Sequence, residues 1–251
     1  MDYKKPKQLF GRKNSKTIKG EKKGWITFIM YLAPHKQNSK GKNICAKASE
    51  GCAAACLYNS GFGGMYNSVQ QARINKTDYF LNETQEFLKQ LDKEVAKLVK
   101  KHKDDNICFR INGTSDLPFE NFKIREGKNI MELYPEVQFY DYTKIASRFH
   151  KELPANYHLT FSRSESNDEE VDLVLAAGGN VAVVFDELPE TYKGYKVING
   201  DLSDLRFKDE ENVIVGLKYK NNTGKGADNN IAFETGFALR KAELIEARAA
   251  A

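Results

Sequence analysis

Short apolar runs rich in β-branched and aromatic residues alternate with helical patterns along most of this chain. The candidate strands span residues 25–33, 107–112, 137–141, 157–162, 180–185, 196–198 and 213–217. The candidate helices span residues 65–76, 80–103 (with Asn82 as its cap), 129–134, 143–150 and 168–177. This alternation favours βα units, in which a helix leads from one strand to a parallel neighbour. We therefore predict an α/β fold, a complete or partial (β/α) barrel of the TIM-barrel type with a cysteine-rich loop near its N-terminus.

Positive charge is concentrated at the start of the chain. Residues 1–42 hold 12 Lys and Arg and two acidic residues, a net charge of +10, whereas the remainder holds 27 basic and 32 acidic residues, a net charge of −5. We predict a basic N-terminal arm over 1–24, a single barrel-like domain over 25–238 and a helical tail over 239–251. A basic arm can bind nucleic acid, although a solvated, frayed terminus is the simpler explanation.

Composition excludes several classes of protein. Of the 251 residues 41% are apolar, which is enough for a buried core and excludes wholesale disorder. No apolar run approaches the roughly 20 residues that span a bilayer, and the first residues lack a secretory apolar region. We therefore expect a cytoplasmic protein with no membrane partner.

Three of the four cysteines lie within 12 residues, since Cys45, Cys52 and Cys56 have the spacing C-x6-C-x3-C. Without a secretory signal, clustered thiols favour a metal site over disulfides. Three thiolates in the loop after the first strand suit a [4Fe–4S] cluster that keeps one iron open. Zinc, with His35 as a further ligand, and unliganded cysteines are the alternatives. Cys108 is expected to be a small core residue, with a role as fourth ligand left open.

Polar residues follow several of the predicted strands at the points where these strands end. Because the carboxyl ends of parallel strands meet at one rim of a barrel, we expect the polar residues to line one pocket. The candidate catalytic residues are Arg110, Asp116, Asp141, Lys144 and Lys218, and the candidate cofactor-binding residues are Gly63, Gly64, Asn112 and Ser115. Arg110 lies within an apolar strand and needs a partner, for which Asp116, Asp141 or an anionic ligand are the candidates.

Longer stretches around these residues resemble a family of uncharacterised tailed-bacteriophage proteins. The matching segments include YLAP at 31–34, NIC at 43–45, SEGC at 49–52, RINGTSD at 110–116 and FYDYTK at 139–144. The resemblance covers roughly residues 17–237. It implies an iron–sulfur protein with a radical-SAM-like barrel, acting in the host bacterial cytoplasm, in which Cys45, Cys52 and Cys56 match the family triplet. It also implies that Cys108 is not a ligand.

We therefore expect a phage-encoded iron–sulfur protein that performs redox or radical chemistry on a small or polar substrate. S-adenosylmethionine is the candidate second cofactor, because an open iron can chelate it. The expected partners are the small-molecule substrate or an electron donor. Two alternatives stay open. One is a non-redox binding protein with a structural zinc or cluster, and the other is a nucleic-acid-binding protein that uses the basic arm.

Overall fold

The computed structural model describes residues 3–11, 15–56, 66–221 and 229–249. The strands are β1 (Phe10–Gly11), β2 (Trp25–Met30), β3 (Asn106–Arg110), β4 (Gln138–Thr143), β5 (Tyr157–Ser162), β6 (Val181–Phe185), β7 (Thr191–Tyr192), β8 (Tyr195–Asn199), β9 (Ile214–Lys218) and β10 (Ala238–Leu239). The α-helices are α1 (Ser15–Glu21), α2 (Glu50–Ala54), α4 (Asn67–Asn82), α5 (Thr84–Lys101), α6 (Ile130–Leu133), α7 (Asp168–Ala176), α8 (Ile231–Glu234) and α9 (Lys241–Ala249). Three 3-10 helices are η2 (Phe119–Asn121), η3 (Ala146–His150) and η4 (Arg206–Lys208).

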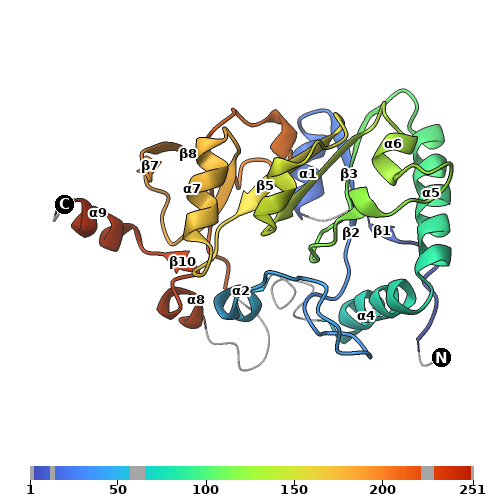
Figure 1. Ribbon diagram of the computed structural model, residues 1–251, viewed down its shortest axis with the longest axis horizontal. Coiled ribbons are helices and arrows are strands. Elements are labelled where there is room, and N and C mark those ends of the chain that lie inside the picture. Colours follow the sequence, from blue (N-terminus) through green and yellow to red (C-terminus); the bar gives the residue numbers. More distant parts are fainter. Residues whose placement is uncertain (1–2, 12–14, 57–65, 222–228, 250–251) are drawn as a thin grey trace.

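The strands form one mostly parallel sheet, so the predicted α/β class is confirmed. Its order is β1-β2-β3-β4-β5-β6-β9-β8-β7, and β10 pairs with β6. The outermost pairs β1–β2 and β7–β8 are antiparallel, and the other pairs are parallel. In Figure 1, α5 lies along the right side of the view, α7 lies at the front left, and α2, α4 and α8 lie along the lower side.

Along the path from β1 to β7, the strand order departs from the order in the chain at β9. β9 lies between β6 and β8, although β8 comes first in the chain. The residues Ile214–Gly216 of β9 are buried, whereas β8 has half-buried and exposed positions throughout. A strand that is apolar on both faces buries more apolar surface at a central position than a half-polar strand would, so the central position stabilises the fold more when β9 occupies it.

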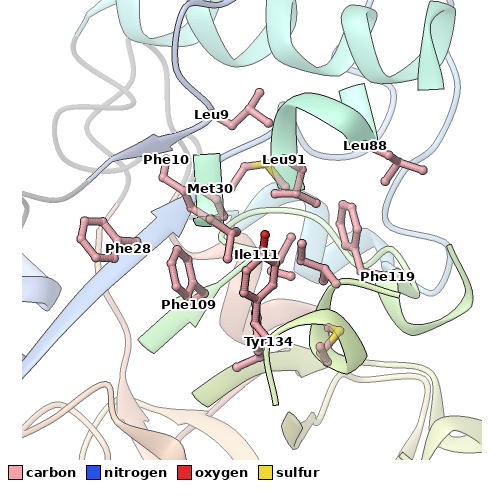
Figure 2. Close-up of a cluster of buried hydrophobic side chains, with 14 of the residues drawn as sticks. Leu9, Phe10, Phe28, Met30, Leu88, Leu91, Phe109, Ile111, Phe119 and Tyr134 are labelled. Carbon is pink, nitrogen blue, oxygen red and sulfur yellow. The ribbon is translucent and has the colours of Figure 1, made fainter. Parts of the chain in front are cut away.

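The main core fills the space between one face of the sheet and the helices α4, α5 and α6. Strand register aligns Phe28, Phe109 and Phe139 across β2, β3 and β4. The rings stack, with centroids 5.4 Å apart for the first pair and 5.5 Å for the second. Leu88 and Leu91 of the amphipathic helix α5 belong to the same core, and Figure 2 shows Leu88 beside Phe119 and Leu91 beside Met30. The row of aromatic rings thus holds the first three parallel strands in one register.

Two predicted helices differ from those observed. The long helix expected over 80–103 begins at Thr84, and Asn82 ends α4 instead of capping α5. The segment predicted as a helix over 143–150 is β4 up to Thr143 followed by the short 3-10 helix η3. In the described part of the chain, no helix has both the length and the apolarity needed to cross a membrane.

The N-terminal segment is not a detached arm. Leu9 and Phe10 are buried in the main core, and β1 pairs with β2. Glu94 on α5 accepts hydrogen bonds from the backbone N–H groups of Leu9 and Phe10, at 2.8 and 3.0 Å. Leu9 and Phe10, which precede the boundary predicted at residue 25, thus belong to the main core.

The opposite face of the sheet holds a smaller core. Cys108 on β3, Tyr140 on β4 and Leu205 are buried together, and Trp25 and Phe207 pack against them. The Cys108 sulfur lies 3.3 Å from the Thr27 hydroxyl. Cys108 is therefore a core residue, and the segment from Leu205 through η4 covers this face of the sheet.

Candidate functional site

A cavity of about 290 Å³ lies at the carboxyl ends of the parallel strands. Side chains from the ends of β3, β4, β5, β6 and β9 form part of its wall. The loop after β2, the loop after β8, Lys19 on α1 and Phe237 before β10 also line it. This is the position at which ligands bind in folds built from βα units.

All three clustered cysteines line this cavity. Cys45 forms an isolated parallel β-bridge with Asp116, which holds the loop after β2 against the loop after β3. Cys52 lies on α2, and Cys56 follows the end of that helix. The chain thus brings to one cavity the three thiols that the sequence predicted as a metal site.

Helix α2 is fixed to the sheet by a carboxylate from the end of β5. The Ser49 hydroxyl accepts from the backbone N–H of Cys52 at 3.2 Å and donates to Glu165 at 2.7 Å. Glu165 also accepts from the N–H of Gly51 at 2.6 Å. A Cβ at Gly51 would clash with Thr235 and would lie 2.7 Å from the Phe237 Cβ. Glycine therefore allows α2 to approach the segment after α8 closely.

Cys45 lies in a buried environment. The N–H of His35 donates to its sulfur at 3.4 Å, and its thiol lies 3.7 Å from the Thr114 carbonyl oxygen. Burial raises the pKa of the Cys45 thiol to about 12, against the lowering effect of the His35 N–H, and the charges of Cys56 and Cys52 add to the rise. The thiolate form would need a cation beside it, which a bound metal supplies.

Lys144, directly after β4, reaches the same wall. Burial lowers the pKa of Lys144, but the charges of Cys52 and Asp116 and a hydrogen bond to Cys52 outweigh burial, so this pKa is raised overall. The backbone N–H of Lys144 donates to Asp116 at 2.8 Å. The carboxylate of Asp116 also pairs with Arg148 at 3.2 Å.

The buried arginine predicted in the third strand is present, but its partner is different. Arg110 pairs at 3.1 Å with Asp204, which lies after β8, and not with Asp116 or Asp141. The guanidinium lies 4.6 Å from the centroid of the Tyr142 ring. Tyr140 donates to the same Asp204 carboxylate at 3.2 Å. This network forms one end of the cavity, and Asp204 is a site residue that sequence reasoning missed.

The three thiols line one cavity, yet in the described part of the chain they do not form a compact metal-binding group. Among the residues that the structure describes, no set of three His, Cys, Asp or Glu side chains is arranged to hold a single metal ion. His35 lines the cavity, and its Nε2 atom is buried without a hydrogen-bond partner among the described atoms.

Comparison with protein-family models gives a match over almost the whole chain. The model described as gene product 88 matches residues 8–235. The chain belongs to the gene product 88 family. The match includes Cys45, Cys52 and Cys56, and it begins before the buried Leu9, so the N-terminal segment is part of the family domain. Searches of curated proteins and of solved structures gave no match.

Several other predicted site residues of this family member have structural roles. Asp141 is fully buried and accepts from the Asn112 N–H at 2.8 Å and from Tyr157 at 2.9 Å. Burial raises the pKa of Asp141 to about 6, against the lowering effect of these donors. The side-chain oxygen of Asn112 accepts from the Ser115 hydroxyl and from the Leu117 N–H. Asp141 and Asn112 thus determine the conformation of the loop after β3. Asn112 and Ser115 line the cavity, whereas Asp141 is not among its lining residues.

The remaining predicted residues fall into two groups. Lys218, at the end of β9, is exposed at the rim of the cavity, and its N–H donates to Asp201 at 2.9 Å. Gly63 and Gly64 lie outside the described residues. Arg163, one of the polar residues that follow the strand at 157–162, also lines the cavity, whereas sequence reasoning missed Asp201 as well as Asp204. Asp201 and Asp204 both follow Asn199-Gly200, a turn signal directly after a short apolar strand.

Proposed function

We propose that this chain is an iron–sulfur protein in which Cys45, Cys52 and Cys56 hold a [4Fe–4S] cluster beside a pocket for a small polar molecule. One observation carries the proposal. The three thiols line the same cavity that receives the polar residues at the strand ends. A cluster on this wall would therefore lie next to the space available to a substrate.

The donor set favours a cluster over a single zinc ion. Zinc in a structural site requires four donors on a tetrahedron at about 2.0–2.3 Å, so three of them would form a compact group. A four-iron cluster is larger and holds its thiolates farther apart. The cysteines that line the cavity are three, Cys45, Cys52 and Cys56, and Cys108 is not among its lining residues, which matches the three thiolates that leave one iron of a cluster open.

With three protein thiolates, one iron of such a cluster remains open, and an open iron can bind S-adenosylmethionine or a substrate and supply one-electron chemistry. The chain itself contributes the remaining wall. Among the lining residues, Lys144 and Lys218 are cationic and form no ion pair with a carboxylate in the described part of the chain, so their placement favours a ligand with an anionic group, such as a carboxylate or a phosphate. We infer a redox or radical enzyme as the class of activity.

We further propose that the sheet is a partial barrel. This interpretation is supported by contacts between strands that are far apart in the sheet order. The loop after β8 reaches Arg110 on β3 and Tyr140 on β4 through Asp204, although β9, β6 and β5 lie between these strands. A strongly curved sheet brings such strands to face one another, as the wall of a barrel does.

The test is metal and sulfide content after purification without oxygen. Wild-type protein is expected to hold about four iron and four sulfide per chain, with visible charge-transfer absorption and a paramagnetic signal after reduction by dithionite. The variant C45A/C52A/C56A is expected to lose all of these. C108A is the matched control, since Cys108 lies in the core beside Thr27 and outside the cavity.

Two outcomes would contradict the proposal. Colourless protein with one zinc per chain, lost in the triple variant, would indicate a structural metal and a non-redox role. Iron content equal in wild type and in C45A/C52A/C56A would show that these three cysteines hold no cluster.

A further inference from the structure

Three lysines from distant parts of the chain lie around Asp201 at the rim of the cavity. Lys19 on α1, Lys218 at the end of β9 and Lys220 shortly after it all line the cavity, and all three are exposed. The carbonyl oxygen of Asp201 accepts from the Lys19 ammonium at 2.5 Å. Its carboxylate accepts from the Lys220 ammonium at 2.8 Å and from the Lys218 backbone N–H at 2.9 Å. We call these four residues the lysine rim. Three ammonium groups and one carboxylate give it a net positive charge.

The fold fixes the position of Lys19, which comes from the N-terminal segment. A Cβ at Gly20 would lie 3.2 Å from the Thr27 hydroxyl oxygen and 3.5 Å from the Leu205 side chain. Helix α1 therefore packs closely against β2 and against the segment that follows the loop after β8. Because that loop carries Asp201, this packing places Lys19 beside it.

The lysine rim retains hydrogen-bond donors and charge for a ligand. In the described part of the chain, the Lys218 ammonium pairs with no carboxylate, and Lys19 and Lys220 each donate one hydrogen bond to Asp201. An ammonium has three donors, so each of these groups has further donors available. Burial raises the pKa of Asp201, but the hydrogen bonds from Lys220 and Lys218 and the charges of Lys220 and Lys19 outweigh burial, so this pKa is lowered overall. Asp201 is thus ionised at neutral pH and offsets one of the three positive charges.

The rest of the cavity has the same sign of charge. Its described lining includes six basic and three acidic residues, and two of the acidic residues, Asp116 and Asp204, pair with the arginines Arg148 and Arg110. The Nε atom of Arg110 is buried without a hydrogen-bond partner among the described residues. A buried donor of this kind needs an acceptor, which a polar ligand in the cavity can supply.

We infer that the lysine rim binds the phosphate group of a small phosphorylated molecule whose remaining part occupies the cavity. A phosphate monoester carries a charge of about −1.5 to −2 at neutral pH and three strong acceptor oxygens, so it can satisfy three ammonium groups. A carboxylate carries a single charge and would leave part of the positive charge unmatched. The cavity, at about 290 Å³, has the size of a site for a small molecule. The inference rests on the pocket of the proposed function and names its ligand class, but it does not require the cluster.

The experiment is a titration of the full-length protein with inorganic phosphate at constant ionic strength, followed by the line width of the phosphorus NMR signal. Wild-type protein is expected to bind phosphate in the millimolar range. K19M, K218M and K220M are each expected to raise the dissociation constant about threefold to tenfold, because each removes a charged donor. The triple variant K19M/K218M/K220M is expected to lose binding. All three positions are exposed, and circular dichroism verifies that the variants fold.

The matched control is K196M. Lys196 on β8 is exposed and pairs with Glu210 at 2.7 Å, as Lys220 pairs with Asp201, but it is not among the residues that line the cavity. K196M is expected to bind phosphate like wild type. Absence of phosphate binding in wild type, or equal weakening in K196M and K220M, would overturn the inference. Displacement of phosphate by equimolar acetate, or by a single-stranded oligonucleotide in a salt-dependent manner, would assign the lysine rim to a carboxylate or to nucleic acid and would overturn it as well.

The failure of this inference and the failure of the proposed function can be distinguished. Phosphate binding that depends on the three lysines in protein without iron and sulfide would support the inference while the cluster fails. Full iron and sulfide content without phosphate binding would overturn the inference alone.

Discussion

At the scale of single residues, Arg110 is a buried charge at the cavity. The residue is only 5% exposed and relies on Asp204, which in turn accepts from Tyr140. A buried ion pair adds little net stability, but removal of one partner leaves an uncompensated charge. The pair therefore fixes the loop after β8 over β3 and β4 at the end of the cavity.

We predict that D204N lowers the free energy of unfolding by about 3–5 kcal/mol, because Arg110 remains buried without a counter-charge. The measurement is urea unfolding near neutral pH. D201N is the control, since its partner Lys220 is half exposed at the surface, and it should cost at most about 1 kcal/mol. Equal losses in the two variants would show that Arg110 does not depend on Asp204.

At the scale of secondary-structure elements, the short helix α2 determines where two of the three cysteines lie. Five residues do not form a stable helix alone, so its position depends on Ser49 and Glu165 and on close packing at Gly51. Sequence patterns did not indicate this helix, although Ser49 followed by Glu50 is a recognisable N-terminal signal.

We predict that G51A displaces α2, because the added methyl group would overlap Thr235 and Phe237. Overpacking of this kind costs about 1–3 kcal/mol, and the displaced helix should retain less iron than wild type after desalting. A53G, which changes a half-buried position of the same helix, is the control for helix propensity. Full iron retention in G51A together with wild-type stability would contradict the role given to this glycine.

At the scale of the whole molecule, the segment before β2 completes the main core. Figure 2 shows Leu9 and Phe10 directed toward Met30 and Phe109, beneath the helix that carries Leu88 and Leu91. Deletion of residues 1–24 would therefore remove part of the core as well as the positive charge. A test of nucleic-acid binding by this basic segment needs charge reversal at exposed lysines such as Lys4, Lys7, Lys22 and Lys23.

We predict that L9A lowers the free energy of unfolding by about 2–5 kcal/mol, because it creates a cavity at a fully buried position. Chemical denaturation followed by circular dichroism measures this loss. K7A, at an exposed position two residues earlier, should change stability by no more than about 0.5 kcal/mol. A negligible effect of L9A would mean that the N-terminal segment is dispensable for the core.

Part of the candidate site could be predicted because it depends on local patterns. Parallel strands separated by helices place their carboxyl ends at one edge of the sheet. For this reason the polar residues after the strands predicted at 107–112 and 137–141 share one cavity with the cysteines that follow the strand predicted at 25–33. The partner of Arg110 could not be predicted in this way. Asp204 lies 94 residues along the chain from Arg110, and it follows a strand that pairs out of sequential order.

The sequence by itself determined the alternating elements, the parallel sheet and the group of thiols near its edge, because periodicity and spacing report local burial and local geometry. Only the tertiary structure decided that Leu9 completes the core, that β9 lies between β6 and β8, that Arg110 pairs with Asp204 and that Asp141 accepts from the loop after β3. These choices depend on close packing between distant segments, and the free-energy differences that select them arise from burial and charge pairing in three dimensions.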